Sequence, residues 1–107
     1  MSLVYAWKSS AINISASNTL TAETDLTRPF DLMAIDMPAL TSTNLYVQGA
    51  QNAAGVFKRL GGDNNYLACA AANYMEVVKI YGFQYIKLEC ATAQAANVTF
   101  KVRGIAL

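Results

Sequence analysis

Acidic side chains are the residues of this chain that could perform acid–base chemistry, because its 107 residues include no histidine. Without imidazole, the Ser/His/Asp and Cys/His arrangements and the His-containing zinc sites are excluded. Two carboxylate pairs could act as general acid and base, namely Asp31 with Asp36 and Glu76 with Glu89. Nothing beside them marks a substrate cleft, so we interpret them as solvated strand-edge charges and expect no enzyme activity.

One polar loop, Gly61-Gly62-Asp63-Asn64-Asn65, places several side-chain oxygens close together. Such loops can bind calcium, but this one offers a single carboxylate, while Gly, Asp and Asn all suit tight turns with positive φ. We interpret it as a chain reversal. The phosphate-cradling GxGxxG and P-loop patterns do not occur, and we expect neither a cofactor nor a metal.

Tyrosines offer a different kind of site, because each combines a large apolar ring with a polar hydroxyl. A stacking platform for sugar rings could be formed by Tyr46, Tyr66, Tyr74, Tyr81 and Tyr85, with Gln48, Asn64 and Asn65 bound to sugar hydroxyls. Core packing and protein interfaces use the same residue types. Glycan contact, through Tyr46, Gln48, Tyr66 and Tyr85 above all, is therefore an alternative hypothesis.

Composition favours contact with other proteins. The apolar share is 54% and the charged share 14%, with a formal net charge of +1, whereas an average soluble protein is about 25% charged. The scattered charges predict no nucleic-acid partner and no anionic membrane partner, and no apolar run reaches the roughly 20 residues that span a bilayer. The apolar surplus favours self-association or docking on a larger assembly.

The two cysteines, Cys69 and Cys90, are expected to be free and buried. The sequence contains no basic, hydrophobic segment of the leader type, so we expect the chain to be made and assembled in a cytoplasm.

Alternating apolar residues predict the elements that position these groups. Val98, Phe100 and Val102 alternate with polar residues, and so do Ile86, Leu88 and Cys90. Segments 44–49 and 56–60 predict a hairpin with a long polar loop. Phe30 to Met37 is apolar on both faces, which predicts a central strand or one covered by another subunit. Arg28-Pro29 and Gly82 are expected to interrupt strands, and the alanine-rich run 68–72 to form a loop or short strand.

Together these patterns predict an all-β fold, a single-domain antiparallel β-sandwich over residues 1–107. We expect it to be jelly-roll-like, with about seven to nine short strands.

Several segments, among them Ile35-Asp36-Met37-Pro38, Leu45-Tyr46-Val47-Gln48-Gly49 and Gly82-Phe83-Gln84-Tyr85-Ile86-Lys87-Leu88, occur in a recognisable order. In this order the chain resembles small β-sandwich virion accessory proteins of tailed bacteriophages. The resemblance implies a capsid decoration or cement protein of the virion. Its partners would be the major capsid protein or another virion protein, together with copies of itself, for instance in a trimer. We expect the contacts at Tyr5, Trp7, Phe30, Met33, Ile35, Met37, Ile105 and Leu107.

Part of the pattern, a strand ending in Gln48-Gly49 followed by the strand Tyr85-Ile86-Lys87-Leu88, is also similar to discoidin-type sandwiches. That likeness implies the alternative of a carbohydrate-binding module or a receptor-binding accessory domain of a tail. The chain departs from this pattern at residues 50–55, where the usual Ser-x-Asp-Gly turn is absent, and at Gln84, where an arginine is usual.

Overall fold

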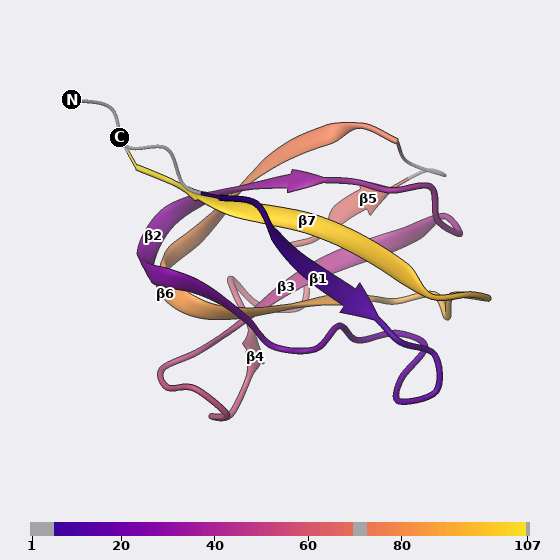
Figure 1. Cartoon of the computed structure of the whole chain (residues 1–107), viewed down its shortest axis with the longest axis horizontal. Coiled ribbons are helices and arrows are strands. Elements are labelled where there is room, and N and C mark those ends of the chain that lie inside the picture. The colour runs from indigo at the N-terminus through magenta and orange to yellow at the C-terminus, as the bar shows by residue number, and fades with distance from the viewer. Residues whose placement is uncertain (1–5, 70–72, 107) are drawn as a thin grey trace.

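A computed structural model describes residues 6–69 and 73–106, and its strands confirm the single-domain all-β prediction (Figure 1). The described ranges contain no helix long and apolar enough to cross a membrane. Their strands are β1 (Lys8–Ile12), β2 (Thr24–Asp36), β3 (Thr43–Ala50), β4 (Lys58–Arg59), β5 (Leu67–Cys69), β6 (Met75–Cys90) and β7 (Val98–Ile105).

All seven strands belong to one antiparallel sheet with the order β1-β7-β2-β6-β3-β4, and β5 pairs with β3. Strands from the first and second halves of the chain alternate across most of this sheet. The predicted hairpin is present, because Gln48 of β3 pairs with Arg59 of β4. Distant segments therefore meet throughout the fold.

The sheet folds into two layers because β2 and β6 bend together (Figure 1). Thr27 of β2 has a φ of 76°, and Tyr81 and Gly82 of β6 have φ values of 56° and 82°. The register of β2 against β6 shifts on both sides of Phe30. The expected interruptions at Pro29 and Gly82 are thus wrong, since both strands continue through a bulged corner instead of ending there.

Inward-facing side chains from both layers form the core. On β7, Val98, Phe100 and Val102 are buried while Thr99 and Lys101 are exposed, so the predicted alternation is confirmed. The other fully buried large side chains are Ile12, Met33, Ile35, Met37, Leu45, Ile80, Ile86 and Leu88. The core therefore lies between two layers. One consists of β1, β7, the second half of β2 and the first half of β6, and the other of β3, the first half of β2 and the second half of β6.

Candidate functional site

The strand that was expected to carry the interface turns its predicted contacts inward. Met33 and Ile35 are 0% exposed, Met37 is 1% exposed and Phe30 is 4% exposed. These four residues belong to the core of the chain itself, and their assignment to an interface is corrected here. The strand is central, as predicted, because β2 lies between β7 and β6. Its other face, which carries Leu32, is the outer one.

Neighbouring strands extend that outer face in register. Leu32 lies opposite Ile105 of β7, and Ala34 lies opposite both Arg103 of β7 and Val77 of β6. We call this surface the outer apolar face, and it consists of Trp7, Leu32, Ala34, Met75, Val77 and Ile105. The structure thus brings together Trp7 and Ile105, two of the predicted contacts. Tyr5 and Leu107 lie outside the described residues.

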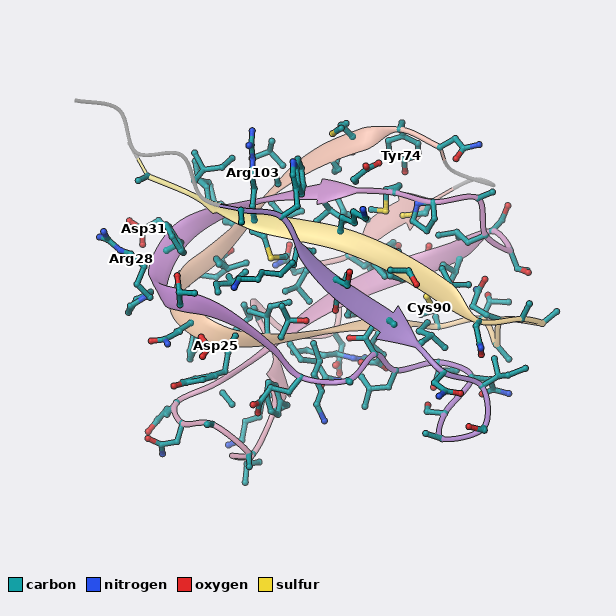
Figure 2. The ribbon with its side chains drawn as sticks, viewed as in Figure 1. Asp25, Arg28, Asp31, Tyr74, Cys90 and Arg103 are labelled. Carbon is teal, nitrogen blue, oxygen red and sulfur yellow. The ribbon has the colours of Figure 1, made fainter. Side chains whose placement is uncertain are left out.

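The outer apolar face combines exposed apolar side chains with one charged side chain, Arg103, which lies between Ala34 and Trp7. Met75 and Val77 are 63% and 53% exposed. Arg103 points away from the sheet (Figure 2), and its guanidinium lies 4.7 Å from the centre of the Trp7 ring. Exposed apolar side chains that gather on one face of a sheet mark sites of contact with other proteins. The arrangement can bind a partner by burial of apolar area.

A second cluster occupies the outside of the other layer and holds β3, β4 and β6 together. The Arg59 guanidinium makes two hydrogen bonds to the Glu89 carboxylate, Nε to Oε1 at 3.0 Å and Nη2 to Oε2 at 2.7 Å. It also bonds Asp63 at 2.9 Å and lies 3.8 Å from the centre of the Tyr46 ring. Hydrogen bonds from Arg59, and then from Gln48, hold the pKa of Glu89 below its usual range.

This cluster leaves the predicted sugar platform unformed. The rings of Tyr46 and Tyr66 lie 5.6 Å apart but are tilted by 57°. The amide of Gln48 donates to Glu89 at 2.8 Å, so it is already engaged. Tyr85 lies opposite Ala50, four residues along β3 from Tyr46, which is about 13 Å along a strand. The four residues do not present coplanar rings to one ligand.

The predicted carboxylate pairs and the polar loop are also placed by the fold. Glu89 pairs with Arg59, whereas Glu76 lies opposite Ile35 in the other layer. In the loop, Gly61 and Gly62 have φ values of 77° and 88°, as a chain reversal requires. Among residues 6–69 and 73–106, no three His, Cys, Asp or Glu side chains gather where they could hold a metal ion.

Both cysteines are free and buried, as predicted. Cys69 pairs with Thr43 on one side of β3, and Cys90 pairs with Leu45 on the other. One whole strand therefore separates them, about 10 Å from backbone to backbone, which is too far for a disulfide. Burial raises the pKa of Cys90 to about 11, and the adjacent Cys69 thiol raises the pKa of Tyr74 to about 12.

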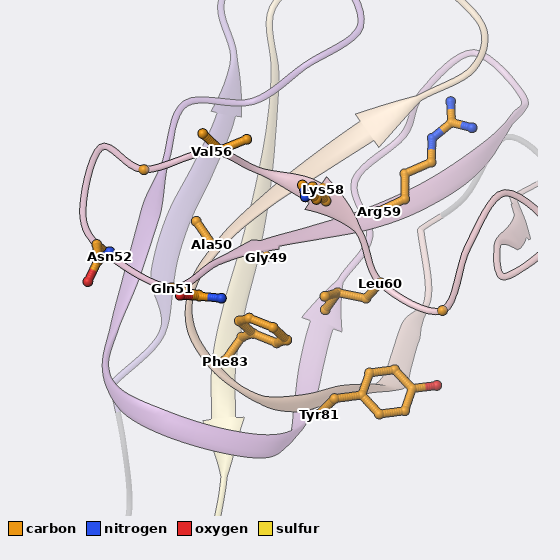
Figure 3. A pocket seen from close by; sticks show the side chains of 12 residues that line it. Gly49, Ala50, Gln51, Asn52, Val56, Lys58, Arg59, Leu60, Tyr81 and Phe83 are labelled. Atoms are coloured by element: carbon orange, nitrogen blue, oxygen red, sulfur yellow. The ribbon is translucent and has the colours of Figure 1, made fainter.

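A concave pocket of about 680 Å³ lies between the β3–β4 hairpin and the bend of β6 (Figure 3). Leu60 and Phe83 form its floor against Gly49, where a Cβ would lie 2.9 Å from both side chains. Tyr81 stands at the rim with a 54% exposed side chain. The exposed Lys58 is also part of the lining, while Arg59 points away. Sequence patterns did not indicate this pocket, because it forms only where the segment 49–61 meets Tyr81 and Phe83 of β6.

Comparison of the chain with protein-family models, with curated proteins and with solved structures finds no match.

Proposed function

We propose that this chain is a non-enzymatic structural subunit of a phage virion, a decoration or cement protein that binds a capsid or other virion protein and copies of itself. The resemblance to small virion sandwiches supports a place in a phage virion. The outer apolar face supports binding to other proteins through apolar contact. Such a subunit stabilises an assembled shell because it binds that state preferentially.

The outer apolar face carries this proposal. Complete burial of a Val or Met side chain contributes about 1.5–3 kcal/mol. Met75 and Val77 are more than half exposed, so a partner that covers both gains roughly 2–3 kcal/mol from these two side chains. Association costs at least about 4 kcal/mol. A partner must therefore cover most of the face, including Trp7 and Leu32, and a flat sheet surface suits such broad contact.

Sedimentation velocity over a range of protein concentrations, combined with co-sedimentation with shells that lack the protein, tests this function. We expect wild type to self-associate and to bind shells. Val77→Lys places a charge on a strongly exposed part of the face and should weaken both by about tenfold or more, equivalent to about 1.4 kcal/mol. Thr99→Lys is the matched control, because Thr99 is exposed but lies near the opposite end of β7 from Ile105, where it pairs with Ala11 of β1. This variant should leave self-association and shell binding unchanged. A strict monomer that fails to bind such shells would overturn the proposal.

The pocket supports a second candidate function, the binding of an acidic sugar. The Tyr81 ring offers an apolar surface for a pyranose, and the Lys58 ammonium can pair with a carboxylate. Lys58 forms no ion pair with any residue in the described ranges. A volume of about 680 Å³ suits a ligand of one to three sugar rings. Tyr81 also adopts a strained positive φ, which is common at ligand sites.

Titration calorimetry with oligosaccharides of hexuronic acid, beside neutral oligosaccharides of equal length, tests the second candidate. We expect the acidic series alone to bind, with affinity lost in Tyr81→Gly and reduced in Lys58→Gln. Lys101→Gln, on the outer side of β7, should bind as wild type does. Absence of binding by every sugar, or equal binding by Lys58→Gln, refutes sugar recognition at this pocket.

A further inference from the structure

Within residues 6–69 and 73–106, the first half of β6 has one edge that pairs with no other strand. The Met37 N–H donates to the Tyr74 carbonyl at 2.8 Å, and the register continues with Ile35 opposite Glu76 and Met33 opposite Val78. In an antiparallel ladder, alternate residues direct their N–H and C=O groups to opposite sides. Residues 76 and 78 therefore bond to β2, whereas Met75, Val77 and Lys79 direct their backbone groups away from it.

No strand among the described residues takes up those outward groups. β3 pairs with β6 only from Tyr85 to Cys90, and β5 pairs with β3 instead. A groove of about 180 Å³, lined by Val77 and Lys79 on one side and Leu67 on the other, runs beside the edge. An apolar strand edge of this kind is a template for another strand.

We propose that this edge pairs with the same edge of a second copy of the chain, antiparallel, around a two-fold axis at Val77. The proposal rests on the self-association in the proposed function and specifies its geometry. Val77 then lies opposite Val77 of the second copy, and Met75 lies opposite its Lys79. The outward backbone groups of residues 75, 77 and 79 in both copies form about six hydrogen bonds.

Charge and shape make the edge self-complementary in this register. On the outer face, Asp36 lies beside Met75, so Lys79 of the second copy occupies the next position in the same row. Its long side chain extends over Met75 toward Asp36. Neither Asp36 nor Lys79 forms an ion pair within residues 6–69 and 73–106. The two-fold axis repeats the contact between Lys79 and Asp36, so it forms twice in the dimer. No like charges lie opposite each other in this register.

The two outer apolar faces also become continuous in this dimer. Val77 and Met75, which are at the margin of the face in one chain, lie at the centre of the paired surface. A closed two-fold pair uses up both edges and does not propagate into a filament. The dimer thus removes an exposed edge and doubles the apolar surface that is available to a shell.

Cysteine cross-linking tests the register. Directly opposite hydrogen-bonded residues have Cα atoms about 5.5 Å apart, which permits a disulfide. Val77→Cys should therefore form a covalent dimer under mild oxidation. Met75→Cys alone should not, because the two copies of residue 75 are offset by four residues, about 13 Å. The double variant Met75→Cys/Lys79→Cys should cross-link again. Native Cys69 and Cys90 are buried and do not compete.

The results separate failure of the register from failure of the proposed function. If Val77→Cys stays uncross-linked, or if Met75→Cys cross-links equally well, while wild type still self-associates, the register is wrong and the function stands. If wild type is monomeric and binds no shell, the function fails as well. Hydrogen exchange on unmodified protein gives a second readout. The amides of residues 75, 77 and 79 should gain protection at high protein concentration, and unchanged exchange at those three would overturn the pairing.

Discussion

Replacement of Gly104 by alanine tests the closest packing in the core. Gly104 of β7 lies opposite Met33 of β2, and the ring of Phe30 packs against it. A Cβ at position 104 would approach three carbons of that ring more closely than real Cβ atoms approach other atoms. Phe30 is 4% exposed. The ring can make room only by a move that disrupts its packing.

The magnitude lies between two limits. An extra methyl in a well-packed core costs about 1–3 kcal/mol when neighbours can shift. Complete loss of a buried phenylalanine ring costs about 3–5 kcal/mol. Because three ring carbons clash with the new methyl group, we expect Gly104→Ala to lower the free energy of unfolding by about 3 kcal/mol. A domain of this size has roughly 5–15 kcal/mol in total, and the melting temperature should fall by roughly 15 °C.

Urea unfolding, followed by circular dichroism and by the fluorescence of Trp7, measures this loss. Gly62→Ala is the matched control, because nothing lies within 4 Å of a Cβ there and only its φ of +88° is unfavourable; it should cost about 1 kcal/mol. In the Phe30→Ala background, Gly104→Ala should become nearly neutral, which gives a coupling of about 3 kcal/mol. A loss below about 1 kcal/mol for Gly104→Ala, or strict additivity with Phe30→Ala, would refute the steric reasoning.

Three further predictions concern the electrostatics and the backbone. The hydrogen bonds from Arg59 lower the pKa of Glu89 in the folded protein. Glu89 therefore stabilises the fold at pH values above its pKa in the unfolded chain, and this stabilisation disappears as the pH falls through its lowered pKa in the folded protein. Glu89→Gln should therefore unfold about 1 kcal/mol more easily than wild type at neutral pH, and a urea titration in which this difference persists in strong acid would contradict the assignment. Cys69 and Cys90 are both buried, and burial raises the pKa of Cys90 to about 11. Native protein should therefore leave both thiols unreacted with Ellman's reagent at mildly alkaline pH, whereas both should react in denaturant; rapid reaction of native protein would show that they are accessible. Tyr81 has a φ of 56°, a value at which a β-branched residue is strained. The Tyr81→Gly variant should therefore be about 2 kcal/mol more stable than Tyr81→Val, and equal melting temperatures of the two variants would exclude that strain.

Much of the strand pattern could be predicted from sequence because alternation is a local property. Val98, Phe100 and Val102 face inward, and so do Ile86 and Leu88, as their period-two spacing predicts. The hairpin of β3 with β4 and the reversal at Gly61 also follow from local composition. The candidate site was less predictable, since Trp7 and Ile105 lie on the outer apolar face while Met33 and its neighbours do not.

Where both faces of a strand are apolar, sequence cannot say which one is buried. In β2, Met33 and Ile35 alternate with Leu32 and Ala34, and only packing against Val102 and Phe100 selects the first pair for the core. The bend is a second example. Gly82 suggested an end of a strand, but β6 continues because its neighbours β2 and β3 supply hydrogen bonds on either side of the corner.

The sequence by itself determined the all-β class, the reduced buried thiols and the lack of histidine chemistry, because composition and two-residue periodicity are read along the chain. Tertiary structure alone decided which face of β2 became the outer apolar face and which edge of β6 stayed unpaired. It also decided that Arg59 would meet Glu89, 30 residues away. These outcomes depend on the order of strands in the sheet, and contacts between distant segments set that order.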